Sequence, residues 1–169
     1  MNGDPIGTTT DDLHVALNPE YQWAYNNDEN NVAVYGRLYT WFAVNDSRKI
    51  CPTGWHVPAY SEVVTLVNYL GGYLTNAGKL KEAGTIHWNS PNVGATNSTG
   101  FTALPSGYRA DVGTFIGFSS FGMWWTSGSF DLNGDSYGNS LSTYSSSIVI
   151  GYGGGSLKAH GLSVRCIKD

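Results

Sequence analysis

The sequence is short of charged residues and of long hydrophobic runs. It has 9 lysines and arginines and 13 aspartates and glutamates in 169 residues, so charged residues make up 13%, about half of the usual ~25%. No hydrophobic run approaches the roughly 20 residues that a membrane-spanning helix needs. The net charge of −4 speaks against nucleic acid as a partner, because its recognition begins with a basic face. We therefore expect neither a membrane span nor a nucleic-acid partner.

Glycines and aromatic residues are abundant instead. The chain has 22 glycines, 6 tryptophans, 11 tyrosines and 6 phenylalanines, and 41% of its residues are hydrophobic. This content excludes a disordered tail, and the length suits one domain with its own core. Few charges together with many glycines and aromatics indicate an irregular, loop-rich domain rather than a helical bundle.

The two cysteines, Cys51 and Cys166, lie far apart in the sequence. A CxxC redox pair and a zinc knuckle are therefore excluded. Two interpretations stay open: two free, buried thiols, or one disulfide that ties the end of the chain to the start of the main helix. A disulfide would imply an oxidising compartment. The first residues lack the basic and apolar stretches of an export signal, so we expect that such a signal was removed or never present.

Helical periodicity is clearest in one stretch of the first half. Apolar residues recur there at positions i, i+3, i+4 and i+7, namely Val63, Leu66, Val67 and Leu70. Gly71-Gly72 predicts the end of this helix, and Glu62 suits its first turn because a carboxylate stabilises the positive end of the helix dipole. Residues 76–83 predict a short second helix with Asn76 as a possible N-cap.

The other segments indicate strands, turns and loops. Residues 35–44 are dense in aromatic and β-branched types and predict a strand or a packed extended segment. Residues 51–58, with two prolines, predict a rigid turn. Residues 162–167 alternate between apolar and polar types and predict a half-buried strand in which Ser163 and Arg165 face outward. This order of elements indicates an α+β domain.

Seven motifs occur in a fixed order along the chain: YGRLYTWFAVND (35–46), CPTGWHVP (51–58), TLVNYLGG (65–72), GKLKEAG (78–84), GATNSTGFTALPSGYR (94–109), GMWWTS (122–127) and GLSVRCIKD (161–169). Together they resemble the Fibrobacter succinogenes major paralogous domain family, from about residue 21 to residue 169. That family is similar to proteins of C-type lectin-like fold and, more distantly, to formylglycine-generating enzymes. The resemblance implies a single α+β domain of C-type lectin-like fold at 21–169, preceded by an extended lead-in at 1–20.

The same resemblance implies further features. The domain should have two helices, small antiparallel sheets and a long loop-rich region. Members are typically found on exported bacterial or phage-encoded proteins, which implies a location outside the cell, on its surface or on a phage particle. Some members are the variable proteins of diversity-generating retroelements, in which adenine positions in the last part of the gene are mutated. Related variable proteins can be displayed as multimers, so an oligomer is conceivable here.

The catalytic motif of formylglycine-generating enzymes is missing. Those enzymes use a closely spaced cysteine pair near the last strand, whereas Cys166 has no cysteine near it. The four histidines show no metal-binding spacing, and for His56 we expect a structural hydrogen bond rather than catalysis. We therefore expect a protein that is not an enzyme, with no catalytic residue, no metal and no cofactor.

Calcium-dependent sugar binding is a further function that the fold implies. Lectins of this fold use Glu-Pro-Asn or Gln-Pro-Asp with Trp-Asn-Asp, whereas this chain has Ser90-Pro91-Asn92 and Trp88-Asn89-Ser90, which lack the carboxylates that a hard cation needs. Residues 131–135 imitate the start of an EF-hand loop, but Ser136 and Ser142 stand where Gly and Glu are required. We expect a polar loop there rather than a calcium site.

The segment 129–157 has an unusual composition. Its 29 residues include 8 Ser, 6 Gly, 3 Tyr and 2 Asn, the residue types that antibody binding loops use. None is Lys, Glu, Gln, Met or Trp, although these types make up 18 of the 169 residues. Every residue type present can be written with a codon ending in a pyrimidine, the set reached when adenines of Asn-type codons are randomised. Serine- and glycine-rich surface strands and turns are the structural alternative.

These observations predict a non-enzymatic ligand-binding domain, with segment 129–157 as its variable binding region. Its ligand would be an unknown protein or glycan. The candidate contact residues are Phe130, Asp131, Asn133, Asp135, Tyr137, Asn139, Ser142, Tyr144, Ser146, Ile148, Ile150 and Tyr152. A bacterial surface adhesin or carbohydrate-binding module of fixed specificity is the alternative, and an enzyme related to formylglycine-generating enzymes is a more remote one.

Overall fold

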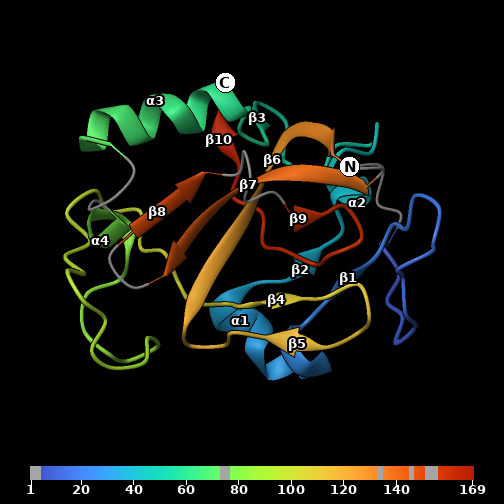
Figure 1. Cartoon of the computed structure of the whole chain (residues 1–169), viewed down its shortest axis with the longest axis horizontal. Coiled ribbons are helices and arrows are strands. Elements are labelled where there is room, and N and C mark those ends of the chain that lie inside the picture. Colours follow the sequence, from blue (N-terminus) through green and yellow to red (C-terminus); the bar gives the residue numbers. More distant parts are fainter. Residues whose placement is uncertain (1–4, 73–76, 133–134, 145–146, 151–155) are drawn as a thin grey trace.

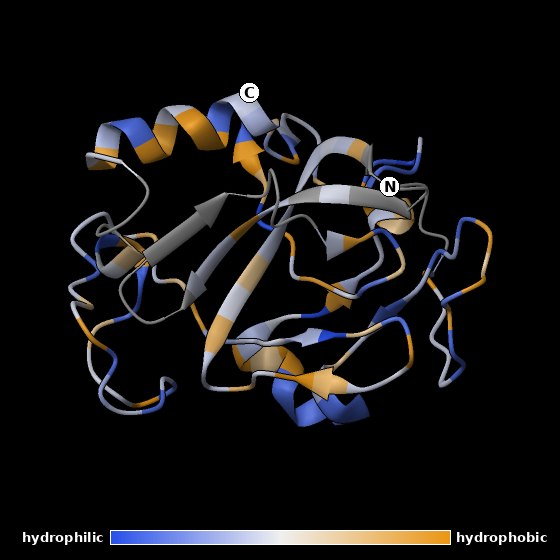
Figure 2. Cartoon of the chain, in the orientation of Figure 1, coloured by the Kyte–Doolittle hydropathy of each residue, from blue (hydrophilic) through white to orange (hydrophobic). Residues whose placement is uncertain are grey.

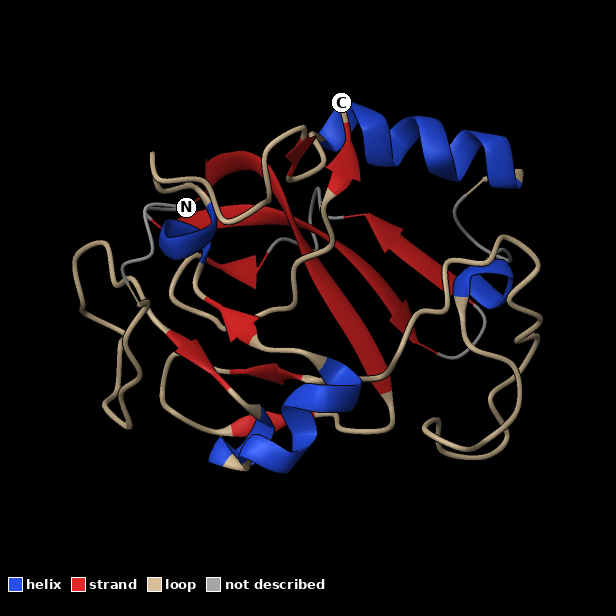
Figure 3. Cartoon of the chain, turned by 180° about the vertical axis from the view of Figure 1, so that it is seen from behind, coloured by secondary structure: helices blue, strands red, loops and turns tan. Residues whose placement is uncertain are grey.

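The computed structural model describes residues 5–72, 77–132, 135–144, 147–150 and 156–169. The helices are short: η1 (Tyr25–Asn27), η2 (Glu29–Asn31), α1 (Val32–Tyr35), α2 (Trp41–Val44), α3 (Tyr60–Leu70) and α4 (Ala77–Leu80). The strands are β1 (Gln22–Trp23), β2 (Leu38–Tyr39), β3 (Trp55–His56), β4 (Tyr108–Arg109), β5 (Phe115–Ile116), β6 (Phe121–Leu132), β7 (Asp135–Tyr144), β8 (Ser147–Ile150), β9 (Ser156–Leu157) and β10 (Ile167–Lys168). Few helices and several small antiparallel sheets make this an α+β arrangement, with long loops between the elements (Figures 1 and 3).

Helix α3 confirms the predicted main helix. Val63, Val67 and Leu70 are buried along one side, and Figure 2 shows hydrophobic and hydrophilic residues alternating along the helix. The helix ends at Gly71, which adopts a φ of 99° that favours glycine. In the first turn, the Glu62 carboxylate accepts a hydrogen bond from the backbone N–H of Ala59 at 2.8 Å.

Two local predictions are only partly right. Residues 35–44 do not form one strand, because Gly36 takes a positive φ of 73° and breaks the extended run. The chain then forms β2 and turns into α2, where the Thr40 hydroxyl accepts a hydrogen bond from the N–H of Ala43 at 3.4 Å. The second predicted helix is shorter than 76–83, because Lys81 leaves the helix and bridges to Ala103. The proposed cap Asn76 lies outside the described residues.

The predicted strand at 162–167 also differs from the structure. Leu162 and Ser163 are both buried, and they form single bridges to Tyr39 and to Trp124. Ser163 is wrongly predicted to face outward: its hydroxyl lies 2.9 Å from the buried hydroxyl of Ser106, and this hydrogen bond lets a polar side chain enter the interior. Regular pairing begins only at β10, which is antiparallel to β3.

The largest sheet contains most of segment 129–157. Its strand order is β6-β7-β8, and β9 pairs with β7 as well. Strands β6 and β7 form a long antiparallel hairpin that crosses the middle of the molecule in Figure 1, with α3 alongside. The register shifts between Trp125 and Ser129, which divides the hairpin into an inner part and an outer part. These two strands, of 12 and 10 residues, are longer than the short strands expected from the sequence.

Two neighbouring tryptophans of β6 belong to separate hydrophobic clusters. Trp124 packs with α3, α4 and Leu141 of β7 in one cluster, and Trp125 packs with Trp41, Val44 and Leu162 in the other. Successive residues of a strand point to opposite sides of a sheet, which explains the division. The Trp125 indole also donates a hydrogen bond to the carbonyl of Tyr39 at 2.6 Å. The β6 strand thus contributes to both halves of the core.

The residues before β1 are attached to the domain. Leu13 is buried, and its N–H donates a hydrogen bond to the carbonyl of Asp111 at 2.7 Å. The Trp23 indole donates to the carbonyl of Thr9 at 2.6 Å, and the Arg109 guanidinium donates to the carbonyl of Asp11 at 2.8 Å. The described part of the lead-in therefore packs on the surface of the fold.

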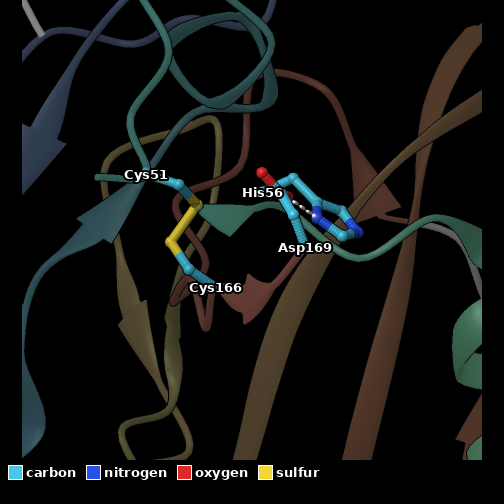
Figure 4. Close-up of a disulfide and its surroundings, with 4 residues drawn as sticks. All are labelled: Cys51, His56, Cys166 and Asp169. Atoms are coloured by element: carbon cyan, nitrogen blue, oxygen red, sulfur yellow. Dashed lines mark hydrogen bonds and ion pairs between the residues drawn. A yellow bond between two sulfur atoms is a disulfide. The ribbon is translucent and has the colours of Figure 1, made fainter. Parts of the chain in front are cut away.

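Cys51 and Cys166 form a disulfide, which confirms one of the two interpretations of the sequence. Their Cα atoms lie 5.8 Å apart, and no cysteine is free. Figure 4 shows the bond next to His56 and Asp169. It joins the turn before β3 to the residue before β10, so a covalent link supports a strand pair of only two residues per strand.

Removing the disulfide should destabilise the fold strongly. The bond closes a loop with a sequence separation of 115, for which the chain-entropy model gives about 4–5 kcal/mol. We expect the double variant Cys51→Ala, Cys166→Ala to lose about this much free energy of unfolding in urea titrations. A reducing agent should lower the melting temperature of the natural chain and leave that of the variant unchanged. Two titratable thiols in unreduced, unfolded protein would contradict the bond.

Gly138 of β7 should not tolerate a side chain. A Cβ atom at this position would lie 2.4 Å from Cδ1 of Trp41 and 2.6 Å from Cζ3 of Trp125. We expect Gly138→Ala to reduce the free energy of unfolding by about 1–3 kcal/mol through overpacking. Gly7→Ala is the matched control, since its Cβ would meet only Tyr21 at 4.0 Å. Equal stability of the two variants in urea titrations would show that the tryptophans do not pack on Gly138.

Candidate functional site

The predicted contact residues lie mainly on the β6–β7–β8 strands. Phe130 and Asp131 are at the end of β6, Asp135, Tyr137, Asn139, Ser142 and Tyr144 are on β7, and Ile148 and Ile150 are on β8. The strand register brings Phe130 opposite Tyr137 and Leu132 opposite Asp135. Asn133, Ser146 and Tyr152 fall outside the described residues. The structure therefore gathers the described members on one continuous sheet.

The inner part of β7 is buried. Ser140 and Thr143 are 0% exposed, Ser142 is 3% exposed and Leu141 is 4% exposed. The side chain of Ser142 is therefore not available at the surface, and we leave it out of the binding surface. At the other end of the hairpin Ser129 is exposed and Phe130 is half-buried. We name residues 129–132 and 135–137 the hairpin end. In the strand register it continues β6 and β7 past the buried inner part.

His56 joins α3, β3 and the end of the chain in a clasp. Its Nδ1 lies 2.6 Å from Oδ1 of Asp169, and its Nε2 lies 3.0 Å from Oε2 of Glu62 (Figure 4 shows the pair with Asp169). The hydrogen bonds to Asp169 and to Glu62 raise the pKa of His56 above its usual value. The hydrogen bond from the Ala59 N–H, followed by that with His56, lowers the pKa of Glu62.

The pH range in which this clasp stabilises the fold follows from the pKa shifts of His56 and Glu62. Folding raises the pKa of His56. Its contribution to the free energy of unfolding is therefore fully present below the usual imidazole pKa of about 6.5, and is lost as the pH rises through the raised value. Folding lowers the pKa of Glu62. Its contribution to the free energy of unfolding is therefore present above the usual carboxyl pKa and is lost as the pH falls through the lowered value. The clasp is therefore strongest at mildly acidic pH.

Replacing Asp169 should lower the pKa of His56. We expect Asp169→Asn to move this pKa toward about 6.5, because the hydrogen bond to Asp169 is the largest cause of the shift. An NMR titration of the His56 ring protons measures the change. Glu29→Gln removes an equal charge from the pair with Arg37 and should leave the His56 titration unaltered. An ordinary pKa for His56 in the natural chain would contradict the clasp.

A second histidine cluster surrounds Asp111. Nδ1 of His14 lies 2.8 Å from Oδ2 of Asp111, and Nε2 of His160 lies 3.5 Å from Oδ1. Burial, partly offset by Asp111, lowers the pKa of His160, so its imidazole is neutral near pH 7. Burial is the largest single influence on Asp111 and opposes its ionisation, but the hydrogen bond with His14, the charge of His160 and the backbone hydrogen bond from Val112 together outweigh it and lower the pKa of this carboxyl. The cluster attaches the residues before β1 to the loop that follows β4.

Cavities open on the surface among the described residues, and three of them concern the side chains discussed above or their neighbours. One of about 550 Å³ is lined by residues of α3, β6 and β7 together with Phe101 and Arg165. Arg165 also lines a second cavity of about 290 Å³, with Tyr39 and Ser163. A third of about 460 Å³ includes His56 and Ser127. Sequence reasoning missed all three, because their walls come from segments that are distant in the chain and no local motif marks them.

Neither a metal-ligand cluster nor a membrane-spanning helix is found among the described residues. No group of three or more His, Cys, Asp or Glu side chains there is placed to hold a metal ion. None of the helices in the same part of the chain has the length and hydrophobicity needed to cross a bilayer.

Comparison with known proteins gives one match. The family model described as the Fibrobacter succinogenes major domain matches residues 1–168, so the match includes the lead-in as well as the seven motifs, apart from the final residue of the last one. Neither the comparison with curated proteins nor that with solved structures finds a match.

Proposed function

The chain belongs to the Fibrobacter succinogenes major domain family, and from this premise we propose that it is a non-enzymatic ligand-binding domain. The observation that carries the proposal is the hairpin end, which continues β6 and β7 past an inner part that is buried and anchored by Trp124 and Trp125. Its strands are held by backbone pairing, which does not depend on the identity of the side chains. Such a surface can vary without loss of the fold.

The chemistry of the hairpin end suits binding. Phe130 and Tyr137 are opposite each other in the register, and aromatic residues are the most frequent anchors of binding surfaces. Asp131 and Asp135 add polar contacts from the same stretch, and serines supply adaptable hydrogen bonds. We propose these four residues, with Asn133 and Asn139, as the principal contacts, and Tyr144, Ser146, Ile148, Ile150 and Tyr152 as further ones.

A binding role fits the histidines better than catalysis does. Both ring nitrogens of His56 are engaged by carboxylates, so neither is left to accept a proton from a substrate. Ser127, which lines the same cavity, is not among the partners of His56. Cys166 is bonded to Cys51 and has no thiol for covalent chemistry. These contacts support the proposal that the protein has no catalytic site.

The fold, the location and the origin of the binding segment are parts of the same proposal. Short antiparallel sheets, few helices and long loops support a C-type lectin-like fold. The disulfide supports an oxidising environment, and with it display outside the cell or on a phage particle. The depletion of Lys, Glu, Gln, Met and Trp in segment 129–157 supports a variable protein of a diversity-generating retroelement.

Arrays of glycans and proteins provide the test of ligand binding. The natural chain should bind a defined ligand, and the double variant Phe130→Ala, Tyr137→Ala should weaken its affinity by at least about 30-fold, which is the ~2 kcal/mol of a hot-spot anchor. The melting temperature should change by only a few degrees. Leu17→Ala, which truncates a side chain that is 94% exposed and remote in sequence, is the control and should bind normally. Unchanged affinity of the double variant would place the binding surface elsewhere.

The gene provides the test of diversification. We expect a near-repeat of its 3′ end beside a reverse transcriptase gene. If the ligand binds at the hairpin end and no such repeat exists, a bacterial adhesin or carbohydrate-binding module of fixed specificity replaces the variable protein.

A further inference from the structure

The cavity of about 550 Å³ beside α3 has the properties of a small-molecule site. Its volume lies within the range of roughly 300–1,000 Å³ that is usual for ligand pockets. Its walls are mainly hydrophobic, with Leu66 on α3, Trp124 on β6, Leu141 on β7 and Phe101 from a loop among them. We name this cavity the α3 groove. Three of these four residues lie outside segment 129–157, and only Leu141 lies within it. The groove therefore differs from the binding surface proposed above.

One cationic side chain, that of Arg165, lines the mainly hydrophobic α3 groove. The Arg165 guanidinium lies over the ring of Phe101, 4.2 Å from its centroid, and donates a hydrogen bond from Nη1 to the carbonyl of Phe101. Arg165 forms no ion pair with a carboxylate among the residues that the structure describes. The surrounding protein atoms lower its pKa by excluding part of its hydration shell, yet a guanidinium stays charged.

The carboxylate that lines the α3 groove is already engaged. Glu62 also lines the α3 groove, but its carboxylate is held by the N–H of Ala59 and by His56. Arg165 lies at the boundary between the α3 groove and the more polar cavity that includes Tyr39 and Ser163. A guanidinium has five N–H donors, and the carbonyl of Phe101 uses only one of them. The others can bind an anion in a bidentate manner.

We propose that the α3 groove binds a small amphipathic carboxylate, with its acyl chain along Leu66, Trp124 and Leu141 and its carboxylate on Arg165. The cation explains why the ligand is an acid rather than a neutral lipid. The apolar walls explain why the acid carries a hydrocarbon chain. The groove is formed by the same core residues that hold α3 on the sheet, so it is part of the rigid scaffold.

Straight-chain carboxylates of 6, 8, 10 and 12 carbons are the probes. Isothermal titration below the concentrations of micelle formation should show affinity increasing about four-fold for each added methylene, the gain expected from burying one such group. The corresponding alcohols should bind at least about ten-fold more weakly than the acids, because a charge-assisted hydrogen bond is lost. A brominated 12-carbon acid should quench tryptophan fluorescence, since Trp124 and Trp125 line the groove.

Two sets of variants locate the site, one at the cation and one at Leu66. Arg165→Gln should weaken binding of the 12-carbon acid at least about ten-fold, and Arg165→Lys should restore part of the affinity because it keeps the charge. Lys158→Gln is the matched control: it removes a cation that lies 4.5 Å from the centroid of Trp41, away from the groove, and should bind normally. Leu66→Trp should block the groove, whereas Leu66→Met, which conserves volume, should not.

The proposal is overturned by any of four results. The first is no binding of the 12-carbon acid by the natural, disulfide-bonded protein. The second is binding that does not depend on chain length or that is equal for acids and alcohols. The third is equal affinity of the Leu66→Trp and Leu66→Met variants, both folded by circular dichroism. Equal losses in Arg165→Gln and Lys158→Gln would show attraction by net charge only, and would also overturn it.

Discussion

The alternation of Trp124 and Trp125 in β6 is the constraint on which the rest of the domain depends. One side chain packs with α3 and α4, and the other packs with Trp41 of α2 and with Leu162. The facing strand β7 leaves room for the ring of Trp125 with Gly138 and with the small side chain of Ser140, the register partner of Trp125, whereas Leu141 is opposite Trp124. Small residues in β7 are therefore a consequence of large residues in β6.

This packing changes the meaning of the unusual composition of segment 129–157. Part of its glycine and serine content belongs to the buried inner part of β7, where Ser140 and Ser142 face no solvent. The remainder belongs to the hairpin end and to residues beyond it. The composition thus has one physical cause in the space that Trp41 and Trp125 need beside Gly138, and for the hairpin end we propose surface chemistry. The binding surface that we propose is accordingly smaller than the segment that the sequence marks.

Features with a local cause could be predicted from the sequence, and features assembled from distant segments could not. The helix α3 follows from four apolar residues at helical spacing, and the resemblance to a family favoured the correct α+β class. The β6–β7 hairpin had a usable signal, since Asn133-Gly134 between two strand-like runs is typical of a two-residue turn. Ser163 could not be placed, because its burial depends on Ser106, a residue far away in the chain. The α3 groove depends likewise on Arg165 meeting Phe101.

The position of the disulfide has a mechanical consequence. A pulling force applied at Lys168 would reach the covalent bond at Cys166 within two residues and pass from there to Cys51. The β3–β10 pair and the His56 clasp span the same junction, so they share the load with the bond. Strand β6 is connected to the same segment further along the chain, through the backbone hydrogen bonds of Ser163 with Met123 and Trp125. In a domain tethered by this end, the disulfide would therefore pass part of the load to the turn before β3, so that the β6–β7 hairpin does not bear all of it.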